Sequence, residues 1–208
     1  MAQFVITGTG TDIGKTVFAA GLTGLIGADY WKPIQTGVTL GDSDAPRDAG
    51  FVARMTGARI HPEAVILPEP LSPHRAAELA GVTIDPAAID PPDADPLVIE
   101  GAGGVLVPVT RDLLSADLFA RWGIPVILCA TTGLGTISHT LSAIESLRAR
   151  GCPLHGVAFI GDDNPDNIAT IGQIGGVRVL GRLPRLPDLT PEALARAMRD
   201  NFDAGDFA

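Results

Sequence analysis

The chain has 208 residues, 46% of them hydrophobic, and a formal net charge of −9 at pH 7. Its length suits one domain with a full core, and we expect a single domain over residues 1–208. The acidic balance argues against a general nucleic-acid-binding surface, which needs clustered Lys and Arg, so an anionic ligand must be held by a local positive site.

Short apolar runs alternate with helical patterns along the chain. Runs such as Leu97-Val98-Ile99 are apolar without alternation, which is typical of strands covered on both faces in a parallel sheet. This order predicts right-handed βαβ units and an α/β fold with a mostly parallel sheet and helices on both faces, in which ligands gather at the carboxyl ends of the strands. The expected elements are strand 4–7, helix 15–26, strand 30–32, helix 45–56, helix 73–80, strand 97–100, helix 115–121, strand 126–130, helix 137–149, strand 157–160, helix 167–174, strand 177–180 and helix 191–201, followed by a frayed end at 203–208.

The segment from Gly8 to Thr16 reads Gly-Thr-Gly-Thr-Asp-Ile-Gly-Lys-Thr and directly follows an apolar strand. Backbone N–H groups of such a glycine-rich turn cradle phosphate oxygens, and the positive end of the following helix dipole adds to the attraction. Lys15 is expected to reach the β- and γ-phosphates, and the hydroxyl of Thr16 to ligate Mg²⁺. The regular pattern has Gly where this chain has Thr9. We therefore expect a P-loop NTPase-like fold with a variant phosphate loop.

Two further charged residues stand at the ends of expected strands. Glu100 is followed by the glycine-rich run 101–104, and a carboxylate in this place beside a phosphate loop suits Mg²⁺ binding. Lys32 ends a short aromatic strand and precedes a proline. It could stabilise charge on a transferring phosphoryl group, or on a bound carboxylate or carbamate. Both are candidates for the chemistry of one site.

Three helix starts carry residues that can bind a ligand or simply cap the helix. Asp44 opens an expected helix, where the N-cap is the common role, although a carboxylate here could also join a Mg²⁺ shell. The start at 72–74 has Pro at the first helical position, and the start at 135–139 is rich in small residues that suit a carboxylate ligand. Spacing alone leaves these alternatives open.

The chain also carries information about its compartment. Its two cysteines are poor material for a disulfide framework, and residues 1–8 lack the charged start and long apolar stretch of a signal peptide. No apolar run approaches the ~20 residues that span a membrane. We therefore expect a cytoplasmic protein without membrane or nucleic-acid partners.

Six segments, taken in order, resemble the dethiobiotin synthetase family over nearly the whole chain. The phosphate loop looks like that family's own variant, which also lacks the first regular Gly. Any one segment is a weak signal, but six in the right order are specific. The segments are 8–16, Lys32-Pro33 with Thr36-Gly37, Ser43-Asp44-Ala45, Ser72-Pro73-His74, Glu100-Gly101-Ala102-Gly103-Gly104 and Gly135-Thr136-Ile137-Ser138-His139.

The resemblance implies an ATP- and Mg²⁺-dependent ring closure. In that reaction 7,8-diaminononanoate takes up CO₂ as a carbamate, ATP phosphorylates the carbamate, and the second amine displaces phosphate to close a ureido ring. Phosphoryl transfer to a carbamate needs charge neutralisation and alignment more than a protein nucleophile. The residues that the family implies for these tasks are Lys15 and Lys32 beside the phosphoryl group and the carbamate, and Thr11 and Asp12 facing the substrate amines.

The resemblance also implies the binding residues and the assembly. The substrate's carboxylate tail would reach a helix start of the partner subunit, so a homodimer with the site at its interface is implied. The expected metal-binding residues are Thr16, Asp44 and Glu100, and the expected substrate-binding residues are Thr36, Pro73, Gly135, Thr136 and Ser138. The expected nucleotide-binding residues are Asp12, Ile13, Gly14, Lys15, Thr16, Val17, Asp44, Glu100, Gly101, Ala102, Gly103, Gly161, Asp162, Pro184, Arg185 and Leu186.

The chain departs from the family pattern on the base side of the nucleotide. Many members carry Asn after the strand that corresponds to 157–160, where this chain has Gly161-Asp162-Asp163. Purine recognition through that Asn does not carry over, so the preference for ATP over other nucleotides stays open. Arg185 is unusual in the second base-side segment, and Asp12 stands where Glu is frequent.

Two other protein classes share the phosphate loop. Another P-loop amide-forming ligase should not need Lys32 and Thr36 together. A partitioning-type ATPase switch usually carries a further Lys four positions before Gly14, where this chain has Gly10, and no basic membrane-binding tail follows the acidic C-terminus. The sequence therefore predicts an ATP-dependent cyclo-ligase.

Overall fold

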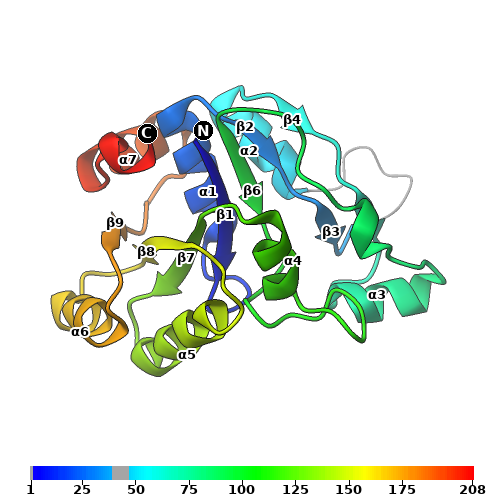
Figure 1. Ribbon diagram of the computed structural model, residues 1–208. Helices are drawn as coiled ribbons and strands as arrows, with labels where there is room; N and C mark the ends of the chain where they lie inside the picture. The colour runs from blue at the N-terminus through cyan, green and yellow to red at the C-terminus, as the bar shows by residue number, and fades with distance from the viewer. Residues whose placement is uncertain (1, 39–46) are drawn as a thin grey trace.

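The computed structural model describes residues 2–38 and 47–208. Its strands are β1 (Gln3–Gly8), β2 (Asp29–Trp31), β3 (Ile34–Thr36), β4 (Ile60–His61), β5 (Val65–Leu67), β6 (Leu97–Glu100), β7 (Val126–Thr131), β8 (Leu154–Ile160) and β9 (Val179–Leu183). A 7-stranded sheet has the order β4-β2-β6-β1-β7-β8-β9, and every neighbouring pair in it is parallel (Figure 1). The strands β3 and β5 form a separate parallel pair.

Helices cover both faces of the large sheet, as expected. They are α1 (Lys15–Ile26), α2 (Asp48–Thr56), α3 (Pro73–Ala80), α4 (Ser115–Trp122), α5 (Thr136–Arg148), α6 (Pro165–Gly175) and α7 (Pro191–Asn201), with the 3₁₀ turns η1 (Pro86–Ala88) and η2 (Ala204–Phe207). The helices α1, α2 and α7 contribute to one core cluster, and α4, α5 and α6 contribute to the other (Figure 1). The α/β class predicted from the sequence is thus confirmed.

The central strand β1 shows why the apolar runs do not alternate with polar residues. Val5 belongs to the core cluster with α4 and α5, whereas Phe4 and Ile6 belong to the cluster with α1 and α7. Since successive side chains of a strand point to opposite faces, both faces of β1 are buried. The strands β6 and β7 divide their side chains in the same way.

Some boundaries differ from the expected ones. Helix α2 begins at Asp48 rather than at 45, and residues 45 and 46 lie outside the described part of the chain. The last strand begins at Val179, because the N–H of Val177 still donates to Gly172 O in the preceding turn. The strands β3, β4 and β5 were not predicted, since each has only two or three residues and shows no period.

The expectation that residues 203–208 fray is wrong. The turn η2 brings Phe207 against Phe4 of β1 in an edge-on contact, and the Phe207 side chain is 1% exposed. His155 packs on the same Phe4, and its Nε2–H donates to the carbonyl of Asp206 at 2.8 Å. One buried aromatic ring therefore fixes an end whose acidic composition indicates disorder.

The register of three neighbouring strands assembles the candidate site. Because β2, β6 and β1 are parallel and adjacent, their carboxyl ends meet at one edge of the sheet. Glu100, the last residue of β6, pairs with Ile6 of β1. Trp31 of β2 pairs with Ile99, so the next residue of the chain, Lys32, lies level with Glu100. The phosphate loop follows β1 at the same edge.

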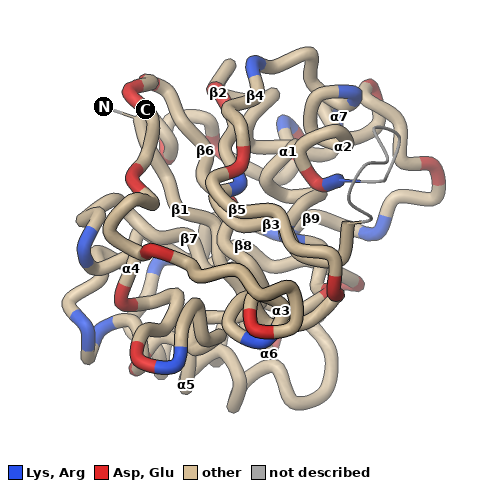
Figure 2. Tube along the Cα trace, turned by 90° about the vertical axis from the view of Figure 1, so that its right-hand side faces the viewer, with Lys and Arg blue, Asp and Glu red and all other residues tan. Residues whose placement is uncertain are grey.

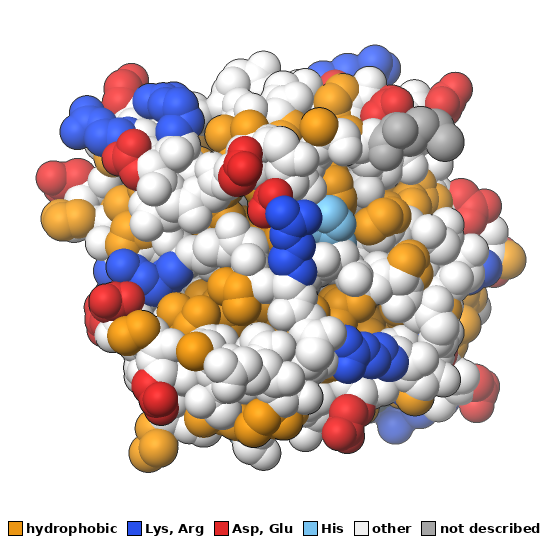
Figure 3. All heavy atoms as spheres, turned by 60° about the vertical axis from the view of Figure 1, so that its left-hand side comes forward, with side chains coloured by type: hydrophobic (Ala, Val, Ile, Leu, Met, Phe, Trp, Pro, Cys, Tyr) orange, Lys and Arg blue, Asp and Glu red, His pale blue; other side chains and the backbone are white. Residues whose placement is uncertain are grey.

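Most charged residues lie outside the strands of the large sheet. Figure 2 shows most of the charged positions on peripheral helices and loops. On the face drawn in Figure 3, Lys and Arg side chains are interspersed with Asp and Glu and with small apolar patches. This face therefore carries mixed charge over the residues drawn in colour. Within 2–38 and 47–208, no helix has the length and apolarity needed to cross a membrane.

Candidate active site

The phosphate loop has the backbone that a strand-to-helix turn requires. Gly14, directly before α1, has φ 96°, and a Cβ there would lie 2.9 Å from Cγ2 of Ile160, so only glycine fits without rearrangement. Asp12 is in the left-handed region with φ 55°, a conformation that Asp tolerates better than most residues. Lys15 is 6% exposed, and its Nζ donates to Gly10 O at 2.7 Å. The loop is thus folded around its own lysine.

A cleft of ≈ 820 Å³ opens beside this loop and gathers most of the residues predicted for the phosphate and substrate ends. The predicted residues that line it are Thr11, Asp12, Gly14, Lys15, Thr16, Val17, Lys32, Thr36, Pro73, Glu100, Ala102 and Gly103. Ile13 and Gly101 do not line it: the Ile13 side chain packs among core residues, and the Gly101 N–H donates to Ile6 O in extension of the β1–β6 pair. Asp44 lies outside the described residues.

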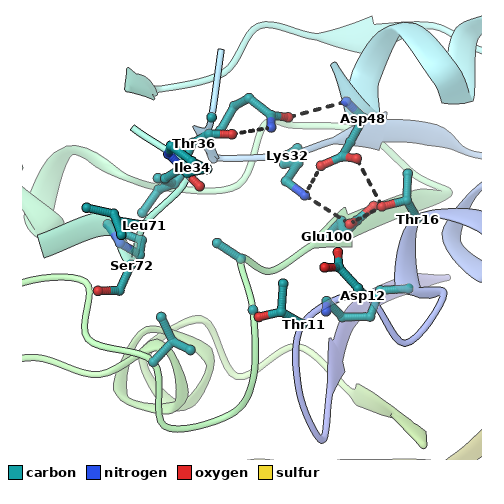
Figure 4. Close-up of a pocket in the computed structure, with 18 of the residues that line it drawn as sticks. Thr11, Asp12, Thr16, Lys32, Ile34, Thr36, Asp48, Leu71, Ser72 and Glu100 are labelled. Carbon is teal, nitrogen blue, oxygen red and sulfur yellow. Dashed lines mark hydrogen bonds and ion pairs between the residues drawn. The ribbon is translucent and has the colours of Figure 1, made fainter. Parts of the chain in front are cut away.

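Four side chains form a closed polar group on one side of the cleft (Figure 4). Lys32 Nζ donates to Glu100 Oε1 at 2.9 Å and also to Asp48 Oδ2. The Thr16 hydroxyl lies 2.8 Å from Glu100 Oε1 and 3.1 Å from Asp48 Oδ1. Lys32 and Glu100 are 6% and 1% exposed, so these two side chains lie in a setting of low dielectric, whereas the Asp48 side chain is 30% exposed. Figure 4 shows Thr36, Leu71 and Ser72 across the cleft from it.

The two buried lysines have different electrostatic surroundings. Burial lowers the pKa of Lys32, but the attraction of Glu100 and Asp48 raises it by more, so the pKa lies above its ordinary value and the ammonium is held charged. Burial also lowers the pKa of Lys15, and the more distant Glu100 only partly offsets this, so the pKa of Lys15 lies below its ordinary value. Lys32 is the lysine fixed by carboxylates, and Lys15 is the one that lacks such a partner among the described residues.

Asp48 is the site residue that sequence reasoning missed. The acidic residue chosen from the sequence was Asp44, because it stands in a Ser-Asp-Ala triplet. The first residue of α2 is instead Asp48, which is likewise followed by Ala, and its backbone N–H donates to Gln35 Oε1 at 3.3 Å. The start of the amphipathic stretch 48–56 was the available signal, since it places the first-turn carboxylate at 48.

The oxygen atoms of this group fit an octahedral cation. Mg²⁺ binds oxygen at about 2.1 Å, so neighbouring ligands on an octahedron lie about 3 Å apart. The distances from the Thr16 hydroxyl to the two carboxylates, 2.8 and 3.1 Å, match that spacing. No group of three or more His, Cys, Asp or Glu that could hold a metal occurs within 2–38 and 47–208. Such a cation would therefore be completed by phosphate and water oxygens.

A second hollow of ≈ 220 Å³ lies on the expected base side, beyond β7 and β8. Gly161, Asp162 and Arg185 line it, whereas Pro184 and Leu186 do not. Two of its backbone acceptors are already engaged: Thr132 O accepts from the amides of Asn164 and Asn167, and Gly161 O accepts from Arg182. Exposed polar groups at this hollow include the carboxylates of Asp162 and Asp163 and the guanidinium of Arg185.

The start of α5 does not reach the cleft of its own chain. Gly135, Thr136 and Ser138 are absent from the lining, and the Thr136 hydroxyl donates to Thr131 O at 2.5 Å. Ser138 is exposed, and the neighbouring Leu134 stands fully in solvent at 108% relative exposure. Gly135 and Ser138 are therefore accessible to a second molecule rather than to the cleft beside them, whereas Thr136 is buried.

The chain is similar to proteins of one kind along its whole length. A family model described as "AAA domain" matches residues 2–193. The "ATP-dependent dethiobiotin synthetase BioD" of Agrobacterium fabrum is 56% identical over 209 residues, which cover 99% of this chain and 96% of that protein. The protein of the same name from Novosphingobium aromaticivorans is 55% identical over 211 residues and covers 100% of both.

Several solved structures are similar to this chain in fold but not closely in sequence. The cell division ATPase MinD of Pyrococcus furiosus superposes with a TM-score of 0.55 at 15% identity, covering 96% of this chain and 99% of that one. The MinC:MinD complex of Aquifex aeolicus gives 0.53 at 13% identity, covering 94% of this chain and 86% of that one. These likenesses confirm the P-loop NTPase-like fold.

The substitution Lys32→Met tests how far this lysine stabilises the polar group around Glu100. The substitution removes the cation between Glu100 and Asp48 and leaves two carboxylates facing each other. We expect the free energy of unfolding to fall by about 3 kcal/mol, the typical result of breaking a buried ion pair from one side. Urea denaturation at pH 7.5 without nucleotide measures it.

The matched control is Arg59→Met. The Arg59 side chain is 75% exposed and lies 3.9 Å from Asp29, so removing this charge should change stability by less than about 0.5 kcal/mol. Equal stabilities of the two variants would contradict the view that Lys32 balances buried carboxylates.

Proposed function

We propose that this chain, which belongs to the ATP-dependent dethiobiotin synthetase family, closes a ureido ring on 7,8-diaminononanoate through a phosphorylated carbamate. ATP-dependent dethiobiotin synthesis by a ligase is the activity of its family. The observation that carries the proposal is the cleft in which the phosphate loop, Lys32 and Thr36 face one another. That arrangement suits phosphoryl transfer to a small acid bound opposite the loop.

The reaction balances without a protein nucleophile. An amine of the substrate adds to CO₂, losing a proton and leaving a carbamate anion. A carbamate oxygen attacks the γ-phosphorus of ATP, and the bond to ADP breaks. The second amine then attacks the carbonyl carbon of the mixed anhydride, phosphate leaves with the bridging oxygen, and a proton is released as the ring closes. The protein must align these groups and neutralise their charge.

Lys15 and Lys32 stabilise the negative charge that develops on the phosphoryl group. Lys15 follows the glycine turn at the N-terminus of α1, where the backbone N–H groups and the helix dipole attract phosphate. Lys32 approaches from the end of β2, beside Thr16, and is held charged by Glu100 and Asp48. Their placement supports two cations, from two different elements, beside the transferring group.

Thr16, Glu100 and Asp48 are the residues that would hold Mg²⁺. The spacing of their oxygens supports this assignment. A bound Mg²⁺ ion would neutralise phosphate charge and orient the β- and γ-oxygens. Asp48 supplies, in this proposal, the acidic group that the family resemblance had assigned to Asp44.

The phosphate loop and the wall opposite it both supply substrate contacts in this proposal. Thr11 and Asp12 lie in the phosphate loop, with Asp12 available to attract the substrate amines by its negative charge. Thr36 ends β3 and Pro73 begins α3, and both line the cleft across from the loop. The base of the nucleotide would occupy the hollow beside Gly161 and Asp162. Pro184 and Leu186 follow β9 next to that hollow.

A homodimer is the assembly we propose, with Gly135, Thr136 and Ser138 of one subunit at the cleft of the other. Leu134 is fully exposed in the loop before α5, and Leu71 is 43% exposed at the rim of the cleft. Apolar side chains in such places favour a covered surface. Both cysteines are free, which supports a reducing compartment such as the cytoplasm.

The reaction is tested directly with the purified chain, 7,8-diaminononanoate, bicarbonate, Mg²⁺ and ATP. We expect dethiobiotin by mass spectrometry, with one ADP and one phosphate per ring closed. If ¹⁸O-labelled bicarbonate is used and read before exchange with water, one labelled oxygen should appear in the released phosphate, because the bridging oxygen comes from the carbamate.

Two results would contradict the proposal. Absence of dethiobiotin with ATP, CTP and GTP alike would contradict the proposed activity. Formation of dethiobiotin together with unlabelled phosphate would support the activity but contradict the phosphorylated carbamate as its intermediate.

The metal site is tested with Asp48→Asn. An amide oxygen binds Mg²⁺ more weakly than a carboxylate, so we expect the Mg²⁺ concentration for half-maximal rate to rise about tenfold or more. Asp90→Asn is the control, because the Asp90 side chain is 70% exposed and pairs with Arg121 away from the cleft. A lower rate at saturating Mg²⁺ with an unchanged half-maximal concentration would show that Asp48 acts through Lys32 instead.

The assembly is tested with Leu134→Asp. We expect the wild-type chain of 21.5 kDa to sediment as a dimer, and the variant to dissociate at least partly, since a carboxylate would be buried at the contact. The KM for the diamine should rise with it. Leu189→Asp changes an exposed leucine before α7 and should alter neither property. A monomeric wild type that still makes dethiobiotin would contradict the shared site.

A further inference from the structure

Tyr30 is a buried tyrosine whose hydroxyl reaches the candidate metal site from the side away from the cleft. It lies in the middle of β2, is 0% exposed, and is the single tyrosine of the chain. Tyr30 pairs with Val98 on β6, and Glu100 follows two residues further along the same face of that strand. A tyrosine side chain is long enough to reach this diagonal neighbour. Its Oη donates to Glu100 Oε2 at 2.7 Å.

The two oxygens of Glu100 have different partners. Oε1 accepts from Thr16 and Lys32, and both of these line the cleft. Oε2 accepts from Tyr30, which does not line the cleft. In the proposed reaction Thr16 turns its oxygen to the metal and Lys32 turns to the phosphoryl group. The bond from Tyr30 is therefore the one that can persist throughout the catalytic cycle.

We propose that Tyr30 is a positioning residue that holds the Glu100 carboxylate by Oε2 and directs Oε1 into the metal site, an inference that rests on the proposed Mg²⁺ site of the preceding section. The terminal torsion of a glutamate is intrinsically soft, so a carboxylate with one oxygen unheld can rotate. Partners of this kind fix the orientation of metal-binding groups in other proteins.

The test is Tyr30→Phe, which keeps the ring and removes only the donor. Mn²⁺ replaces Mg²⁺ as the probe, and its binding to the protein with ADP is followed by electron paramagnetic resonance. We expect the dissociation constant for Mn²⁺ to rise about tenfold, within the range known for removal of a partner of a metal-binding residue. Binding of ADP alone, measured calorimetrically in EDTA, should stay within about twofold, because the phosphate loop does not contact Tyr30.

Trp31→Phe is the matched control. Trp31 is the next residue of β2, is also buried, and donates from Nε1 to Pro62 O on the other face of the sheet. This variant should lose thermal stability without a change in Mn²⁺ affinity. It separates damage to the strand from loss of the bond to Glu100.

Two outcomes would overturn the inference. One is an unchanged affinity for Mn²⁺ in Tyr30→Phe. The other is an equal loss of Mn²⁺ and metal-free ADP binding, which would indicate a structural role only. Because metal binding is measured without turnover, a protein that formed no dethiobiotin would contradict the proposed function while the Tyr30 comparison would still give its answer.

Discussion

The burial of one carboxylate constrains the rest of the site. Glu100 is 1% exposed at the end of a central strand, where a bare charge would be strongly disfavoured. Three donors satisfy it, from Thr16, Lys32 and Tyr30. The donors arrive from two neighbouring segments: Thr16 from the helix after β1, and Tyr30 and Lys32 from β2 and the residue that follows it. The sheet order β2-β6-β1 thus brings together the three donors that satisfy this buried carboxylate.

The same constraint explains which parts could be foreseen from the sequence. Lys15 was identified from the Gly-Lys-Thr motif of the phosphate loop. Glu100 and Lys32 were identified because each ends an expected strand, and parallel strands bring their carboxyl ends to one edge. Tyr30 was regarded only as part of an apolar strand. Its role depends on register, since a shift of one residue would point its hydroxyl to the opposite face. No local pattern encodes that register.

Asp48 and the chain end illustrate a second limit of sequence reasoning. Two Asp-Ala pairs stand four residues apart, at 44–45 and 48–49, and either can begin a helix. Tertiary contacts, which no local pattern encodes, bring Asp48 into the site: its backbone N–H donates to Gln35 at the start of α2, and Lys32 donates to its carboxylate. Phe207 similarly gains its burial from Phe4, some two hundred residues earlier in the chain. Contacts between such distant segments override local composition.

The charge of the cleft bears on how an anionic nucleotide is bound. The acidic chain led us to expect a local positive site, yet the described lining contains two lysines against Asp12, Asp48 and Glu100. The side chains alone therefore carry a negative sum. Attraction for phosphate must come from the N–H groups and dipole at the start of α1, which are positive without bearing a formal charge. A divalent cation between the two carboxylates would reverse the sign of the cleft, so in the proposed reaction metal and nucleotide depend on each other for binding.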